Sequence, residues 1–157
     1  MTQDEMAAIY DKYKNTVYRT AFAYCRNRAD AEDIMQEVFL RRFAAAKTFE
    51  DENSEKAWLL RVTANKCKDL FKSAWRRYNV PLEAAASVAE IPQDNEVYHA
   101  VMALPADYRL AVHLFYYEGY SIAEIARIMR KTEAAAAAVL CRARKRLKRM
   151  LGEELEL

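Results

Sequence analysis

The sequence predicts an all-α protein made of two small helical domains joined by a linker. With only two glycines and three prolines in 157 residues, its composition is rich in strong helix formers. Apolar residues recur at helical spacing through both halves of the chain. Residues 78–93 contain two prolines and carry only acidic charge, which is typical of a linker. We therefore expect domains at 1–77 and 94–157, each with a modest core.

The first domain is expected to begin with a helical hairpin. Thr2 and Glu5 have the spacing of a capping box, which predicts a helix from there to about Cys25. Asn27 is a good N-cap for a second helix, which should run to about Lys47. The apolar stripe of the first helix is Met6, Ile9, Tyr13, Val17, Ala21 and Tyr24.

The second predicted helix has two different faces. One face combines Ala31, Ile34 and Val38 with Arg42, at helical spacing. A second stripe, at i, i+3, i+4 and i+7, is acidic and amide-bearing but contains a leucine. It is either a docking ridge for a basic partner or the solvated side of an ordinary helix with one exposed leucine. The stripe consists of Asp33, Gln36, Glu37 and Leu40.

A long third helix is expected to follow an ordered loop at 48–54, capped by Asn53 or Ser54 and ending near Arg77. The loop is polar except for Phe49. One side of the helix is apolar, with Leu60, Ala64, Cys67, Phe71 and Ala74. The opposite side is cationic with one amide: Arg61, Asn65, Lys68, Lys72 and Arg76. Cations suit phosphates and an amide suits a base edge, and unpaired bases can stack on aromatic side chains. A basic surface helix without a ligand fits the same pattern.

The second domain has the pattern of a helix-turn-helix. Short helices are expected at about 94–103 and 106–118, the latter starting after Pro105 and ending at Gly119. Ser121 and Glu124 form a second capping box for a helix to Met129. After a turn at 130–132, Thr132 should cap a final helix to about Leu151. Two short helices joined by a tight turn, the second one basic, are typical of DNA binding. The expected packing stripe of the last helix is Ala136, Leu140, Ala143, Leu147 and Met150.

The charge is distributed in blocks. Residues 56–77 hold seven Lys or Arg and one acid, and residues 134–152 hold six Lys or Arg and no acid. The stretch between them, 78–98, holds four acids and no Lys or Arg. Two basic blocks indicate two contacts with one polyanion, although solvated faces show similar runs.

Other features exclude several classes of protein. Cys25, Cys67 and Cys141 are odd in number and far apart, so we expect reduced, buried or half-buried thiols. The N-terminus has no signal-peptide core and no apolar run approaches a membrane span, which predicts a soluble cytoplasmic protein without membrane insertion. His99 and His113 have no partners at ligand or catalytic spacing, and no nucleotide-binding loop is present. We therefore expect no catalytic residues, no metal and no cofactor.

Three stretches in this order resemble the bacterial RNA polymerase sigma factors. Residues 31–39 resemble the conserved region 2 helix, and residues 57–65 resemble the promoter-melting helix. Residues 104–109, 117–126 and 142–147 are similar to region 4. The small size and two-domain plan resemble the extracytoplasmic-function (ECF) subgroup. The resemblance covers nearly the whole chain except the linker.

The resemblance implies a function and a set of sites. The ridge of Asp33, Gln36, Glu37 and Leu40 would dock on the clamp coiled coil of the largest polymerase subunit. Region 4 would bind the −35 duplex and touch the flap of the second-largest subunit, and an anti-sigma factor is expected. The single-stranded −10 element, with one flipped base, would contact Phe49, Asn53, Ser54, Arg61, Asn65, Lys68 and Lys72. The −35 element would contact Thr132, Glu133, Ala137, Ala138, Arg142, Arg144 and Lys145.

The chain departs from the family pattern in two places. Residues 134–138 are all alanine where polar or basic groups are usual, and alanine offers only methyl contact with thymine. Arg130 replaces the usual turn glycine, at a position where a left-handed conformation is costly for arginine.

Two other functions fit parts of the same sequence. A stand-alone helix-turn-helix regulator would bind duplex DNA without polymerase, and the second helix discriminates because only a sigma factor needs its ridge. A small helical enzyme would need a catalytic constellation, and none is visible in the sequence.

Overall fold

The computed structural model describes residues 1–78 and 96–152, with side chains at 1–72 and 96–152. The chain divides into two compact units, Met1–Ser87 (unit 1) and Val88–Leu157 (unit 2). The described residues form helices and no strand, so the predicted all-α class with two helical domains is confirmed. The predicted linker, apart from Tyr78, lies outside the described residues. Within the described ranges, no helix has the length and apolarity needed to cross a membrane.

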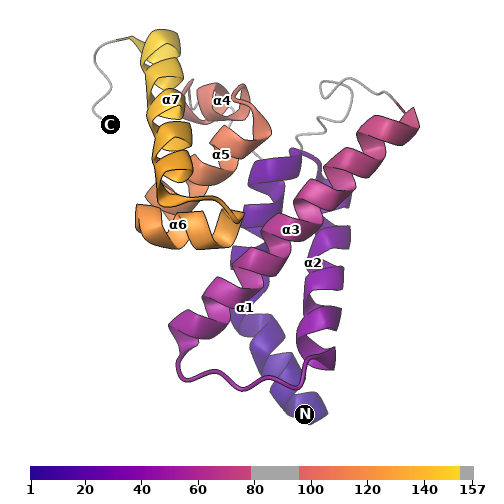
Figure 1. Cartoon of the computed structure of the whole chain (residues 1–157). Coiled ribbons are helices and arrows are strands. Elements are labelled where there is room, and N and C mark those ends of the chain that lie inside the picture. Colours follow the sequence, from indigo (N-terminus) through magenta and orange to yellow (C-terminus); the bar gives the residue numbers. More distant parts are fainter. Residues whose placement is uncertain (79–95, 153–157) are drawn as a thin grey trace. The chain divides into compact units, whose positions relative to one another are not determined.

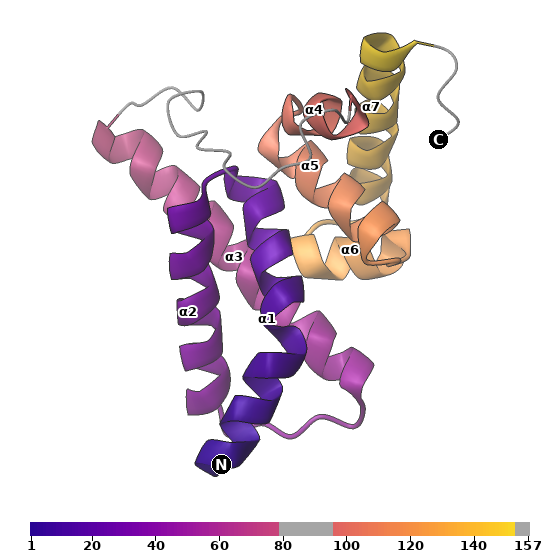
Figure 2. The ribbon, with the colours of Figure 1, turned by 180° about the vertical axis from the view of Figure 1, so that it is seen from behind.

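Unit 1 is a bundle of α1 (Gln3–Cys25), α2 (Arg28–Ala44) and α3 (Glu52–Tyr78) (Figures 1 and 2). The three helices pack against one another. Their shared core follows the predicted stripes, so the hydrophobic period alone orients each helix. Fully or almost fully buried side chains are Tyr13, Val17, Ala21, Ile34, Val38, Leu60, Ala64 and Cys67.

The first two helix starts in unit 1 are as predicted. Thr2 and Glu5 form the reciprocal capping box, with both hydrogen bonds at 3.2 Å. The Asn27 side chain accepts from the Asp30 backbone N–H at 3.0 Å.

Two helix ends in unit 1 differ from prediction. α2 ends at Ala44 and not near Lys47, because Ala45 is already extended with ψ 123°. α3 begins at Glu52, so Asn53 and Ser54 are helical and do not cap it. The capping side chain is Asp51, whose Oδ1 accepts from the Ser54 backbone N–H at 2.7 Å. Aspartate is as good an N-cap residue as asparagine or serine, so Asp51 can start the helix two to three residues earlier than Asn53 or Ser54 would.

Unit 2 places its long last helix against the shorter ones. It contains α4 (Glu96–Met102), α5 (Ala106–Val112), the π-helical turn η2 (His113–Tyr117), α6 (Ile122–Met129) and α7 (Glu133–Leu151). α7 packs against α4, α5 and α6. The helix predicted to run to Glu118 instead changes to π geometry, with the Glu118 N–H bonded to the His113 carbonyl at 3.1 Å.

The helix-turn-helix of unit 2 is α6, the turn 130–132 and α7. Ser121 and Glu124 form the predicted capping box, and Thr132 accepts from the Ala135 N–H at 3.1 Å. Two smaller predictions were wrong. Met150 is 46% exposed and Cys141 is exposed, because the buried face of α7 ends at Leu147 and excludes position 141.

Arg130 ends α6 in the left-handed conformation, with φ 56° and ψ 50°. This geometry disfavours any residue with a Cβ and is readily adopted by glycine. Replacement Arg130→Gly should therefore stabilise the protein by about 1 kcal/mol in urea unfolding of the full chain. Arg127→Gly, within α6, is the matched control and should destabilise by about 1 kcal/mol. A loss of stability in Arg130→Gly would contradict the assignment of strain to this residue.

Candidate functional site

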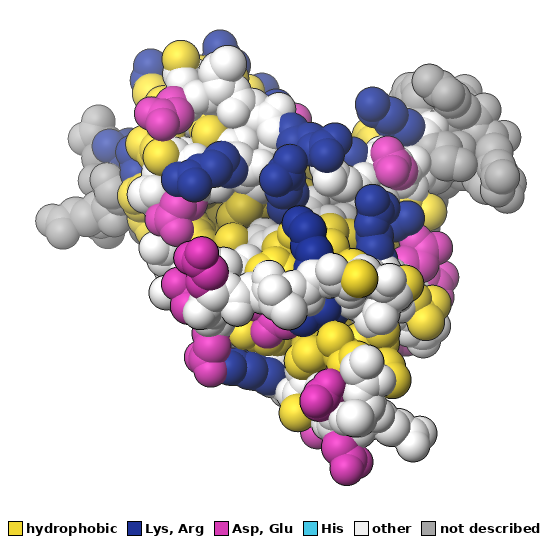
Figure 3. All heavy atoms as spheres, turned by 60° about the horizontal axis from the view of Figure 1, so that its bottom comes forward, with side chains coloured by type: hydrophobic (Ala, Val, Ile, Leu, Met, Phe, Trp, Pro, Cys, Tyr) yellow, Lys and Arg dark blue, Asp and Glu magenta, His cyan; other side chains and the backbone are white. Residues whose placement is uncertain are grey.

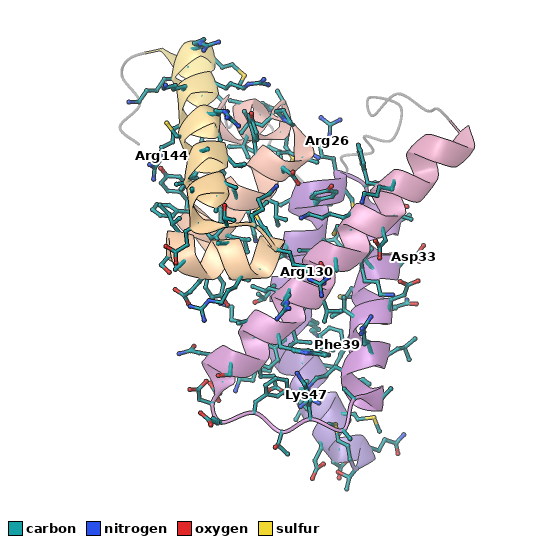
Figure 4. All side chains as sticks on the ribbon, viewed as in Figure 1. Arg26, Asp33, Phe39, Lys47, Arg130 and Arg144 are labelled. Carbon is teal, nitrogen blue, oxygen red and sulfur yellow. The ribbon has the colours of Figure 1, made fainter. Side chains whose placement is uncertain are left out.

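α2 presents an acidic ridge on the side opposite the core. Asp33, Gln36, Glu37 and Leu40 are all exposed, and Leu40 is exposed by 68%. Figure 4 shows Asp33 on the outer side of α2 and Phe39 on the inner side. Phe39 is 3% exposed and lies edge-on to Tyr10 of α1, with ring centroids 5.0 Å apart. The ridge is therefore a continuous surface held outward by a well-packed inner face.

An ion pair joins the ridge to α3. Lys66 Nζ of α3 lies 3.8 Å from Glu37 Oε2, and both side chains are substantially exposed. Exposed pairs at this distance contribute little stability and exchange readily with another cation. The carboxylates of the ridge thus stay available to a basic partner.

The segment between α2 and α3 carries an aromatic and cationic cluster. Phe49 is half-buried, and its ring centroid lies 5.9 Å from that of Trp58. Lys47 Nζ lies 5.9 Å from the same Trp58 ring centroid. Asn53 and Ser54 are exposed in the first turn of α3. Hydrogen bonds from Ser54 hold the pKa of the Asp51 carboxyl below its usual value. Figure 3 shows cationic side chains directly beside hydrophobic surface on the face that it views.

A basic face continues from this cluster along α3. Arg61 and Lys72 are exposed, Asn65 and Lys68 are half-buried, and the opposite side of the helix lies in the core. Since Trp58 and Arg61 are three residues apart, the aromatic cluster lies one turn from the first cation. Unit 1 thus combines stacking surface, cations and an amide, the groups that bind single-stranded nucleic acid.

A buried ion pair that sequence reasoning missed joins the end of α2 to the start of α3. Arg42 Nε and Nη2 lie 2.9 and 2.6 Å from Glu55 Oε2, and the two side chains are 5% and 14% exposed. The Arg42 guanidinium also lies 4.9 Å from the centroid of the Phe49 ring. The sequence contains one sign that Arg42 is buried, because Arg42 occupies the apolar face of α2.

α7 carries the residues predicted to contact the −35 element, and not all of them are fully exposed. Thr132, Glu133, Arg142 and Lys145 are exposed, whereas Ala137 and Ala138 are half-buried. After Glu133, the first turns of the helix therefore offer methyl groups, and its exposed cations begin farther along.

Arg144 is held by two aromatic side chains of η2. Its guanidinium lies 5.0 Å from the Phe115 ring centroid and 5.8 Å from that of Tyr116. Its Nε also donates to the Tyr116 hydroxyl at 2.8 Å. The sequence did not predict this contact, because the two segments are distant along the chain. Arg144 is thus partly committed to packing within unit 2.

The chain matches two models of one family. Sigma-70 region 2 matches residues 9–77, and Sigma-70 region 4 matches residues 94–147. These regions coincide with the bundle of unit 1 and the helix-turn-helix of unit 2, and they define a bacterial transcription initiation factor.

Individual relatives narrow the family further. ECF RNA polymerase sigma factor SigM of Bacillus subtilis is 32% identical over 157 residues, covering 94% of each chain. SigM of Mycobacterium tuberculosis is 32% identical over 148 residues, covering 92% of this chain and 76% of the relative. The chain belongs to the ECF RNA polymerase sigma factors.

Solved structures share the fold. The sigma factor RpoE of Bartonella quintana, in complex with the anti-sigma factor NepR, has a TM-score of 0.79 at 23% identity. That match covers 96% of this chain and 99% of RpoE. CnrH, in complex with the cytosolic domain of CnrY, has a TM-score of 0.67 at 20% identity. This second match covers 98% of this chain and 92% of the CnrH chain.

The Arg144 contacts predict a stability effect. Arg144→Ala should destabilise the protein by about 1–2 kcal/mol, because it removes a stacked guanidinium and its hydrogen bond to Tyr116. Arg142→Ala, an equal truncation of an exposed residue on the same helix, should change stability by less than about 0.5 kcal/mol. Urea unfolding of both variants measures the difference. Equal effects would show that Arg144 does not pack as described.

Proposed function

We propose that this sigma factor docks on core RNA polymerase through the α2 ridge and recognises promoters with both units. The observation that carries the proposal is the exposed ridge on α2, where two carboxylates and an amide lie beside Leu40, which is 68% exposed. The polymerase surface is the clamp coiled coil of the largest subunit. Asp33 and Glu37 supply charge, Gln36 a hydrogen-bonding amide, and Leu40 an apolar contact at the C-terminal end of the ridge.

In unit 1, the −10 element binds as a single strand across the start of α3. Phe49, Asn53 and Ser54 border the site of a flipped base, and Phe49 offers it a stacking surface. The non-template strand then follows the basic face of Arg61, Asn65, Lys68 and Lys72. Flipping a base costs a few kcal/mol, which stacking and hydrogen bonds at the site must offset.

In unit 2, α7 lies in the major groove of the −35 element, and the unit also touches the flap of the second-largest polymerase subunit. Thr132 and Glu133 begin the helix at the groove, Ala137 and Ala138 give methyl contacts to thymine, and Arg142, Arg144 and Lys145 bind phosphates. The contact is therefore dominated by the DNA backbone, while base recognition is limited to apolar edges.

The same assignment implies regulation and location. Because RpoE and CnrH are each solved in complex with a second protein, we propose that an anti-sigma factor also binds this chain. A polymerase subunit works where transcription occurs, so the protein acts in the cytoplasm. It contributes binding and strand separation and no catalytic activity of its own.

A stand-alone helix-turn-helix regulator is the alternative supported by unit 2 alone. It predicts tight duplex binding in the absence of polymerase and no role for α2. Binding to core polymerase therefore separates the two functions.

Charge reversal on the ridge tests polymerase docking. Asp33→Lys combined with Glu37→Lys should abolish binding to purified core polymerase, because it places cations against a basic partner surface. Duplex DNA binding by unit 2 should remain. Fluorescence anisotropy with labelled protein measures binding to core polymerase, and gel shift of a short duplex measures DNA binding.

The single variant Glu37→Lys has a matched control in Asp11→Lys, an equal charge change at an exposed position on α1. Glu37→Lys should weaken core binding by about tenfold or more, and Asp11→Lys by less than about twofold. Wild-type affinity in the double ridge variant would rule out docking through α2.

Phosphate contacts by α7 should appear in the salt dependence of duplex binding. Arg142→Ala and Lys145→Ala should each reduce the slope of log affinity against log salt by about one unit. The uncharged neighbour Cys141→Ala should leave the slope unchanged. Titration of the full chain with a duplex at several salt concentrations measures the slopes, and a wild-type slope in both Arg142→Ala and Lys145→Ala would remove these residues from the interface.

A further inference from the structure

Holding the bundle together does not by itself explain the buried ion pair between α2 and α3. Arg42 follows Val38 on the inner face of α2, where an aliphatic side chain would continue the core. Burying a guanidinium and a carboxylate carries a desolvation penalty that their attraction roughly offsets. An apolar pair of similar volume would stabilise the bundle as well. Arg42 therefore needs an explanation beyond packing.

Two of the three sides of the Arg42 guanidinium have partners in unit 1. Its Nε and Nη2 edge holds Glu55 Oε2, in the first turn of α3. Its Cζ lies 4.9 Å from the centroid of the Phe49 ring, and that centroid lies 5.9 Å from the centroid of the Trp58 ring. The third side, Nη1, is buried and has no hydrogen-bond partner among the described residues. One planar group thus ties the end of α2, the connecting segment and the start of α3 together.

The connecting segment itself has few other restraints in its middle. Asp51 caps α3 through Ser54, and the Tyr13 hydroxyl donates to the Glu52 carbonyl at 3.3 Å, both at the α3 end of the segment. The Phe49 ring is placed by its contacts with Arg42 and Trp58. A lysine could supply the charge but not a flat surface against the ring.

We propose that Arg42 is a positioning residue for −10 recognition, which orients Phe49 to stack on the captured base. This inference rests on the proposed function. Arg42 lies at the end of the helix that carries the polymerase-docking ridge, so the same element fixes both the docking surface and the stacking ring. Loss of Arg42 should leave docking on core polymerase intact. It should remove the contribution that the captured −10 base makes to promoter binding.

The test uses variants that separate orientation from stability. Arg42→Met combined with Glu55→Leu removes both buried charges and keeps apolar volume, so the fold is retained. Arg42→Lys keeps the charge and loses the planar group. Phe49→Ala removes the stacking ring itself and identifies the base position that depends on it.

Each holoenzyme is titrated with forked promoter fragments, taken from a promoter that the wild-type holoenzyme uses, in which one non-template −10 base at a time is replaced by an abasic site. With the wild-type protein, one abasic position should weaken binding by about tenfold or more, the range of base stacking on an aromatic ring. In Phe49→Ala, and in the Arg42 and Glu55 double variant, that penalty should fall below about threefold, with the penalties at other positions unchanged. Arg42→Lys should reduce the same penalty.

Unfolding temperature and affinity for core polymerase are measured alongside. A double variant with wild-type stability, wild-type core affinity and a wild-type abasic profile would overturn the positioning role. If that variant does not fold, an unaltered profile in Arg42→Lys overturns it in the same way. A wild-type protein that forms no holoenzyme would overturn the proposed function and this inference together, whereas an unaltered profile in the variants overturns this inference alone.

Discussion

Burial of the inner face of α2 is the constraint on which the arrangement of unit 1 depends. Ile34 and Val38 are 3% and 0% exposed, and burying each contributes about 1.5–3 kcal/mol. The exposed ion pair between Glu37 and Lys66 contributes at most about 1 kcal/mol. The rotation of α2 is thus set by its core face. Because the helix period is fixed, that rotation places Asp33, Gln36, Glu37 and Leu40 outward.

The same face extends the influence of α2 into the next segment. One turn after Val38 it presents Arg42, which pairs with Glu55 and lies against Phe49. A single helix therefore organises both the exposed acidic ridge and the aromatic and cationic cluster beyond its end. Unit 2 differs, since α7 presents alanine methyl groups in its first turns and cations only farther along. Under the function that we propose, this difference would give unit 1 most of the sequence discrimination and unit 2 most of the attachment to the DNA backbone.

Local chemistry made much of the fold predictable. The capping boxes at Thr2 and Ser121 and the caps at Asn27 and Thr132 set helix starts through contacts three residues apart, which a sequence displays directly. What the sequence could not predict depends on contacts between distant segments. The position of Arg42 on the apolar face of α2 indicates burial, but nothing local identifies Glu55 as its partner or the aromatic rings as the partners of Arg144. The π-helical turn η2 likewise replaces a helix end that looked regular.

The central claim is that this protein confers promoter specificity on core polymerase, and transcription tests it most directly. Purified bacterial core polymerase, with and without the protein, is supplied with a library of genomic fragments, and the 5′ ends of the transcripts are sequenced. We predict discrete start sites that appear only with the protein and share an upstream −10 element. Transcription equal to that of core polymerase alone, from a protein that still binds duplex DNA, would contradict the account.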